Sequence, residues 1–392
     1  DQFITESKTL RDSYKQLQAL NAEHKQINDG IPITPVMQEL PPAQRRFTHI
    51  QNRGSYLDPG DPVNPATPAA FNPWRTEWPV NRLGLAQWLV DDTNPLTARV
   101  LVNRYWGQFF GTGLVRTSED FGVQGELPSH PELLDWLART FMERGWSMKE
   151  LCRVIVNSAT YKEEATVTPA VLAADPNNRL FARGPRFRLE AEMVRDQALA
   201  VSGLLSEKMH GPSVMPYQPE GVWQVVYNGE DWKQSIEEDR YRRGLYTFWR
   251  RTSPYPSMIA FDAPSREVCE LRRIRTNTPL QALVTLNDPV YIEAAQALGR
   301  RIMRYAGNDI DAGLSYGFQL ALSRPPEANE LATLKVLYED CLATYAEQSE
   351  EAIKIATQPL GPLPPAMEPA QAAAWTLVSN TLLNLDEIIT KI

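Results

Sequence analysis

The stretch TPLQALVTLNDPVYIEAAQALGRRI, residues 278–302, contains two successive helix starts. Thr278 precedes a proline and stands three residues before Gln281, which is the spacing of a capping box with proline at the first helical position. Asp288 followed by a second proline repeats the signal, and the residues after it suit a longer helix. We therefore expect helices over 279–287 and 289–306.

Helix starts of the same kind recur along the chain and set the fold class. Asn94 precedes a proline, Ser129 stands three residues before Glu132, and Ser147 stands three residues before Glu150. Together with the apolar periodicity, these starts predict further helices over 82–91, 95–110, 130–144, 147–158, 186–206, 327–346 and 369–391. The expected fold is mainly α, a multi-helix globular domain.

Two parts of the chain break this pattern. Residues 211–255 are rich in Pro, Gly and aromatic residues, and Gly244–Trp249 has the composition of a strand, so we expect a small β or irregular layer there. Residues 5–28 predict an exposed helix or a short coiled-coil arm, and the Pro-rich residues 30–79 predict an extended arm. The expected organisation is a connector over 1–79 and a mainly helical domain over 80–392.

Composition and charge exclude several classes of protein. Of the 392 residues, 43% are hydrophobic, and no run of about 18 apolar residues occurs, so we expect a folded chain without a membrane span. The net charge of −8 argues against nucleic-acid binding. Three distant cysteines, without CxxC or a Cys-His spacing suited to zinc or haem, predict no metal or cofactor within these residues. The chain begins at Asp1 with no leader pattern, which is typical of a segment of a longer protein.

Arginines are concentrated between residues 240 and 275. This window holds nine arginines, no lysine and three acidic residues, a local surplus of six positive charges. A guanidinium pairs bidentately with carboxylate, sulfate or phosphate, whereas an ammonium acts as a point charge. The window predicts an anion pocket with Arg250, Arg251, Arg272, Arg275 and Trp249 as ligand-binding residues. The alternative is that these arginines pair internally with acidic residues elsewhere in the chain.

The loop from Arg116 to His130 is the second candidate site. It is polar, contains two glycines and leads into a helix N-terminus, where outward N–H groups favour an anion, so Arg116 joins the ligand-binding set. Asp120, Glu126 and His130 are the residue types that hydrolysis needs for proton transfer, and they are the catalytic candidates. The alternative is structural: the acids pair with arginines, Ser129 caps the helix, and the histidine makes a hydrogen bond at the helix start.

Several motifs of known enzymes are absent from the sequence. It contains no GxGxxG, GxxxxGK[ST], HExxH or GxSxG, so nucleotide-binding, zinc-protease and serine-hydrolase functions lack support. With only four histidines, catalysis by a histidine-rich metal site is also disfavoured.

Five stretches of the sequence resemble one known family. They are Asn81–Val90, Asn94–Val100, Phe121–Leu137, Arg275–Leu283 and Leu382–Glu387. In this order they are similar to the planctomycete-specific C-terminal domain of planctomycetal cytochrome-c-containing exported proteins, a family of unestablished function. The resemblance implies a periplasmic or extracellular location and a haem-c domain that often precedes this one. This sequence has no CxxCH, so any haem c would lie on a preceding domain, and the family supplies no catalytic residues to carry over.

Two functions from different classes are open at this point. Helix caps and packing signals explain most of the motifs, which favours an extracytoplasmic binding or scaffold domain that recognises an anionic ligand or a partner. The expected partner is the preceding domain of the same protein or a companion exported protein, with an anionic polysaccharide as a candidate ligand. The alternative is a hydrolase, or hydrolase subunit, acting on a sulfated or uronic polysaccharide at a concave site where both candidate segments meet.

Overall fold

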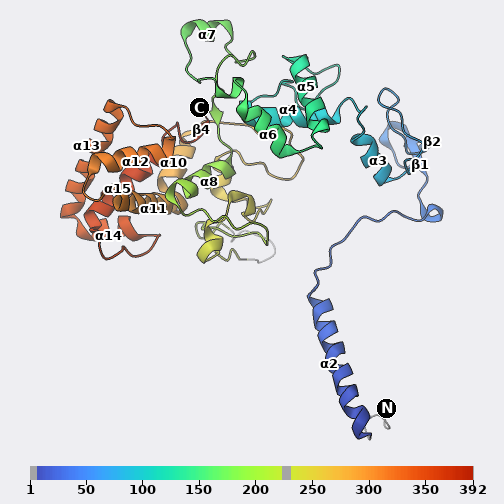
Figure 1. Cartoon of the computed structure of the whole chain (residues 1–392), viewed down its shortest axis with the longest axis horizontal. Helices are drawn as coiled ribbons and strands as arrows, with labels where there is room; N and C mark the ends of the chain where they lie inside the picture. The colour runs from blue at the N-terminus through green and yellow to red at the C-terminus, as the bar shows by residue number, and fades with distance from the viewer. Residues whose placement is uncertain (1–6, 223–230, 392) are drawn as a thin grey trace. The chain divides into compact units, whose positions relative to one another are not determined.

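The computed structural model describes residues 7–222 and 231–391, and the chain divides into two compact units, residues 1–94 and 95–392. Helices dominate, and the described strands form only two-stranded sheets (Figure 1). The predicted fold, mainly α with a small β component, is therefore confirmed. Whether a functional domain begins at residue 80 stays a prediction.

The first unit contains a long helix, a hairpin and a short helix. Its elements are α2 (Lys8–Gly30), β1 (Thr48–Gln51), β2 (Pro59–Val63) and α3 (Arg82–Leu89). The exposed helix predicted near the N-terminus is thus present, and part of the Pro-rich segment forms an antiparallel hairpin. Asn81 caps α3, because its side-chain oxygen accepts hydrogen bonds from the N–H groups of Leu83 at 2.9 Å and Gly84 at 3.1 Å.

Three helices at the start of the second unit enclose a small aromatic core. They are α4 (Thr97–Phe110), α5 (Pro131–Glu143) and α6 (Met148–Asn157), and the short α7 (Pro169–Ala174) follows. The Trp106 and Phe110 rings of α4 stack at 4.2 Å, and Phe181 meets both edge-on at 5.3 Å. This core holds the end of α4 and the loop after it in place.

The rest of the second unit forms a larger helical body. Its helices are α8 (Ala191–Ser202), α9 (Pro256–Ala260), α10 (Pro279–Asn287), α11 (Pro289–Ala306), α12 (Ile310–Leu322), α13 (Ala328–Glu347), α14 (Ser349–Thr357) and α15 (Pro369–Leu383). The central contact joins α11 and α15. A Cβ at Gly299 of α11 would lie 3.0 Å from the backbone of Trp375 on α15, so the glycine permits close approach of the two helices.

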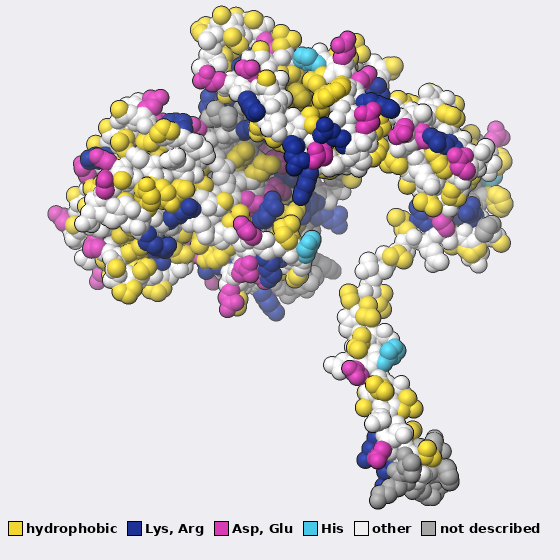
Figure 2. Space-filling view, in the orientation of Figure 1, with side chains coloured by type: hydrophobic (Ala, Val, Ile, Leu, Met, Phe, Trp, Pro, Cys, Tyr) yellow, Lys and Arg dark blue, Asp and Glu magenta, His cyan; other side chains and the backbone are white. Residues whose placement is uncertain are grey.

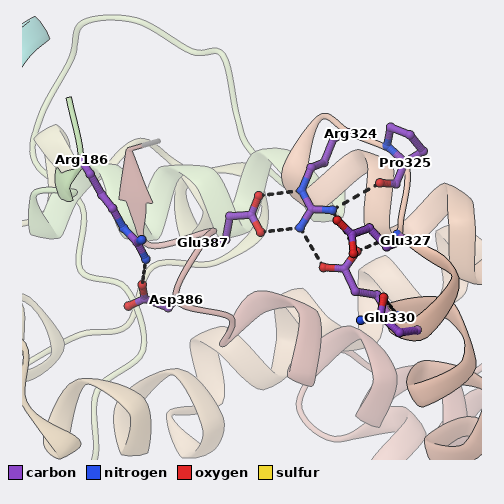
Figure 3. Close-up of polar contacts among 8 residues, drawn as sticks. Arg186, Arg324, Pro325, Glu327, Glu330, Asp386 and Glu387 are labelled. Atoms are coloured by element: carbon purple, nitrogen blue, oxygen red, sulfur yellow. Dashed lines mark hydrogen bonds and ion pairs between the residues drawn. The ribbon is translucent and has the colours of Figure 1, made fainter. Parts of the chain in front are cut away.

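The C-terminal segment is fixed by a short sheet and an ion-pair network. β3 (Phe187–Arg188) pairs antiparallel with β4 (Thr390–Lys391). Arg324 pairs with Glu330 at 2.8 Å and with Glu387 at 2.7 Å, as Figure 3 shows, and so ties the segment after α15 to the start of α13. The end of the chain is therefore anchored both to β3 and to the start of α13.

Some predictions of local structure were wrong. Gly244–Trp249 is not a strand: a 3₁₀ turn covers Gly244–Tyr246, and Thr247 forms an isolated bridge with Val214, so the layer is irregular. The helix predicted over 369–391 ends at Leu383, and α12 and α14 were not predicted.

The capping predictions succeeded in part. Ser147 caps α6 and Asp288 caps α11, the latter by accepting from Val290 N–H at 2.9 Å. Thr278 precedes α10 without a side-chain cap, and α4 begins at Thr97 after Leu96 instead of at the predicted Asn94 cap. Ser129 does not cap α5, because its N–H and its hydroxyl both donate to the carbonyl of Leu114.

Candidate anion-binding cleft

A cleft of about 530 Å³ opens in the second unit, lined by Glu190 and by residues from two segments, 103–118 and 270–275. Its charged residues are Arg104, Arg116, Arg272, Arg273, Arg275, Glu190 and Glu270. Five guanidinium groups thus face two carboxylates, a surplus of three positive charges in a protein whose net charge is −8. In Figure 2, Lys and Arg side chains gather over the middle of this unit, between α4–α6 and α8.

Glycines shape one wall of the cleft. Gly111 directly follows α4, and its φ of +77° is a left-handed conformation that favours glycine. A Cβ at Gly111 would lie 2.7 Å from the Phe187 ring, and a Cβ at Gly113 would lie 2.5 Å from the Asn103 side chain. The chain can therefore turn tightly here and run back along α4 toward Arg116.

Asn103 fixes the loop that carries Arg116. Its side chain is fully buried; the amide nitrogen donates to the Val115 carbonyl at 3.0 Å and to the Ser118 hydroxyl at 3.3 Å. The Asn103 side-chain oxygen accepts from the Val115 N–H at 2.8 Å. The N–H and the carbonyl of the buried Val115 are thus both satisfied by the amide side chain of Asn103, and this sets the path of the loop.

The opposite wall is a loop closed at its base by Asp262 and Thr276. The Asp262 carboxylate accepts from the Thr276 N–H at 2.7 Å and from its hydroxyl at 2.8 Å. Asp262 adopts a positive φ of 59°, and its two hydrogen bonds hold the chain in that conformation. Arg272, Arg273 and Arg275 therefore leave the helical body from one constrained loop.

Two of the arginines in this loop are held by the protein. Arg273 pairs with Glu192 at 2.6 Å and with Glu190 at 3.2 Å. Burial, the largest single influence, would lower the pKa of Arg273, but the hydrogen bond to Glu192 and the charges of the neighbouring carboxylates together outweigh it and raise the pKa. Arg275 donates to the Gly111 carbonyl at 3.1 Å and lies 4.4 Å from the Phe187 ring centroid; burial lowers its pKa.

The other three arginines are accessible to a ligand. Arg272 pairs with Glu119 at 3.0 Å, and both side chains are largely exposed, at 61% and 45%. Among residues 7–222 and 231–391, neither Arg104 nor Arg116 has a hydrogen bond or ion pair, and both are exposed. Such exposed guanidinium groups can accept a new anion at little cost, because an exposed ion pair contributes only about 0.2–1 kcal/mol.

A family model described as PSD1, Protein of unknown function (DUF1553), matches residues 81–338. The chain belongs to this family. The match confirms the resemblance to the planctomycete-specific C-terminal domain. No curated protein and no solved structure matches the chain. Every residue that lines the cleft lies inside the matched range, so the cleft is part of the PSD1 region.

The structure brings three of the predicted ligand-binding residues of this PSD1 chain together and places the other three elsewhere. Arg116, Arg272 and Arg275 line the cleft, whereas Trp249, Arg250 and Arg251 do not. The Trp249 indole N–H donates to the Ser265 carbonyl at 3.1 Å and its ring contacts Arg266, and Arg250 is not free. Arg251 is exposed. A ligand-binding role for these three residues stays a prediction.

The first three arginines of the 240–275 window bond to other groups of the protein. Arg242 is 1% exposed and donates to the Pro212 carbonyl at 3.1 Å. Arg240 pairs with the buried Glu293 at 3.0 Å, and Arg243 lies 3.5 Å from Asp196. The window is therefore divided between internal pairing and the cleft, so both interpretations of the sequence hold for different arginines.

The three catalytic candidates lie outside the cleft lining, and each contacts its own surroundings. The Asp120 carboxylate accepts from the Gly122 N–H at 2.6 Å, and Glu126 lies 3.5 Å from Arg179. His130 Nδ1 lies 3.0 Å from the Ser129 hydroxyl. The pairing of Glu126 with an arginine and the hydrogen bond of His130 are the structural contacts that the sequence also allowed, whereas Asp120 bonds a backbone N–H in place of an arginine. A catalytic role for the three residues stays a prediction.

Sequence reasoning missed Arg104 and Glu190 as cleft residues. Arg104 lies within a helix whose other signals concern packing, and Glu190 lies just before α8. No local pattern marks either residue, because only the approach of distant segments places them together. Among the described residues, no group of three His, Cys, Asp or Glu side chains is placed to hold a metal ion, and no helix has the length and apolarity to cross a membrane.

Proposed function

We propose that this PSD1 chain binds an anionic ligand in the cleft formed by residues 103–118, Glu190 and residues 270–275. The observation that carries the proposal is the pair of exposed guanidinium groups of Arg104 and Arg116, which have no partner in the described parts of the chain. Clustered like charges that are not neutralised internally raise the local concentration of an anion and favour its binding.

The remaining arginines support this function in two ways. Arg272 can exchange its exposed partner Glu119 for a ligand, because an exposed pair is weak. Arg273 and Arg275 are fixed by Glu192 and by the Gly111 carbonyl, so they keep the loop in place and add positive potential. A sulfate, carboxylate or phosphate group would thus meet donors from both walls.

The experiment compares Arg104→Gln and Arg116→Gln with the matched control Arg139→Gln. Arg139 is an exposed arginine of α5 outside the cleft lining. Calorimetric titration with a sulfated disaccharide should show a dissociation constant raised about 10-fold or more in each cleft variant, since a charge-assisted hydrogen bond contributes about 1.5–3 kcal/mol. The control should bind like the parent protein.

Two outcomes would contradict the proposal. Equal affinity in the two cleft variants and the parent would remove the cleft as the binding site. Loss of binding in Arg251→Gln, with no effect of the cleft variants, would move the site to the segment that the sequence also marked.

The wider role of the chain rests on the family resemblance. We propose export to the periplasm or outside the cell, and association with a preceding domain that carries haem c or with a companion exported protein. No described contact favours hydrolysis over binding, so the proposed activity is recognition of the anion.

A further inference from the structure

A second cavity of about 290 Å³ adjoins the arginine-lined cleft. The two share Gly111 and Thr112, so they meet at this turn. Beyond the turn, the lining of the second cavity includes apolar groups such as Phe187 and Pro185, and its polar side chains are Asn177, Asn178, Arg183 and Arg186. Both cavities lie within the second unit.

We propose that the ligand of the cleft is an acidic oligosaccharide, which extends across Gly111–Thr112 into the second cavity. This inference rests on the proposed function and adds the class and length of the ligand. The cleft alone has the volume of a pocket for an organic ligand, about 300–1,000 Å³, and far exceeds what a single sulfate or phosphate fills.

The turn between the cavities contains one residue without a side chain. Gly111 has no side chain, and its left-handed conformation disfavours any other residue. The Phe187 ring covers the side of Gly111 on which a Cβ would point, and Arg275 donates to the Gly111 carbonyl from the cleft. Thr112, which is half-buried, is the one side chain that lines both cavities, so a ligand would cross beside it.

The polar groups along this path suit hydroxyl groups as well as anions. Gln108 and Thr112 line the cleft and Asn177 lines the second cavity, and within the described ranges none of the three side chains makes a hydrogen bond. The free guanidinium groups of Arg104 and Arg116 line the same cleft as the first two. An acidic saccharide presents both charged groups and neutral hydroxyl groups to such a lining.

An acidic peptide fits these linings less well. Leu271 is the only aliphatic side chain larger than a methyl group among the residues that line the cleft, so the side chains of a peptide would find little apolar surface there. The apolar groups of the second cavity, with Phe187 among them, form a face on which the C–H side of a sugar ring can be buried.

The test uses sulfated oligosaccharides of two lengths, a disaccharide and an octasaccharide, with the full chain. We expect the octasaccharide to bind at least 10-fold more tightly than the disaccharide. Thr112→Trp should block the turn and abolish most of the affinity difference between the octasaccharide and the disaccharide. Thr333→Trp, at an exposed site on α13, should leave this difference unchanged. Thermal unfolding monitors folding of each variant.

A second variant keeps the test decisive if Thr112→Trp also disturbs the cleft. Asn177→Ala removes a polar group from the second cavity alone. It should weaken octasaccharide binding about 2- to 10-fold, which is the effect of one lost hydrogen bond, and should leave disaccharide binding unchanged. If neither variant changes the affinity difference between the octasaccharide and the disaccharide, the extended site is wrong.

Other outcomes separate this inference from the proposed function. If both saccharides bind with the same affinity, the anion site stands and the extension is wrong. If a Glu-rich peptide of equal charge binds more tightly than the octasaccharide, the ligand class is wrong. If neither saccharide nor inorganic sulfate binds, the proposed function itself fails.

Discussion

Replacing Asn103 by leucine tests whether one buried amide holds the loop that positions Arg116. Asn103 is 0% exposed, and its side chain satisfies both the N–H and the carbonyl of Val115, itself 2% exposed. Leucine places a side chain of comparable length at the site, but it is apolar and offers neither a donor nor an acceptor. The substitution therefore leaves two buried backbone groups without partners.

The expected cost follows from those two groups. An unsatisfied buried donor or acceptor costs about 1–3 kcal/mol, and burial of the leucine side chain returns roughly 1.5–3 kcal/mol. Gly113 packs tightly against the Asn103 side chain, so the wider leucine also meets steric resistance. We expect the free energy of unfolding to fall by about 2 kcal/mol.

The assay combines urea unfolding with hydrogen exchange of the full chain. Asn157→Leu is the matched control, because Asn157 is an exposed residue of α6 whose amide donates to the Arg153 carbonyl at 2.9 Å. The control should change stability by less than about 0.5 kcal/mol. In Asn103→Leu, backbone amides of residues 113–120 should exchange faster and anion affinity should fall. Equal unfolding midpoints and equal exchange in both variants would refute the role assigned to Asn103.

Two further predictions concern the C-terminal segment. Burial lowers the pKa of the Lys391 ammonium to about 8. Since an unfolded lysine titrates near pH 10.4, the stability of the parent relative to Lys391→Met should rise between about pH 8 and 10.4 and stay level below pH 8, as followed by melting temperature; a constant difference would contradict this. Arg324→Gln removes the pairs with Glu330 and Glu387, both partly exposed, and should lower the local opening free energy by about 1 kcal/mol. Amides of residues 384–391 should then exchange roughly fivefold faster, while Arg304→Gln on the exposed face of α11 should leave them unchanged.

Helices with strong local start signals could be predicted from the sequence to the residue. α10 and α11 begin and end where the pattern places them, because proline at the first helical position and an Asp cap act within one turn of the chain. α12 could not be predicted in this way, because its two glycines weaken a helical pattern. In the fold, Gly313 and Gly317 lie against the Trp375 and Ile302 side chains, where no Cβ would fit.

Errors in the strand and cap predictions have the same origin. The sequence predicts a strand that starts at Gly244, but the N–H of this residue donates to the Asp196 side chain at 2.5 Å and the chain turns there. The sequence predicts Ser129 as a cap, but its N–H and hydroxyl donate to the carbonyl of Leu114, fifteen residues earlier. In each case a distant partner competed with the local one.

The sequence by itself determined the helical class, most helix starts and the family, because these depend on residues within a few positions of one another and on motifs in fixed order. It also indicated that arginines outnumber acids near residues 240–275. Only the tertiary structure decided which arginines pair internally and which, with Arg104 and Arg116, face a common cleft. The reason is that electrostatic pairing depends on distance in space, and the packing of α4 against the loop closed by Asp262 and Thr276 sets that distance.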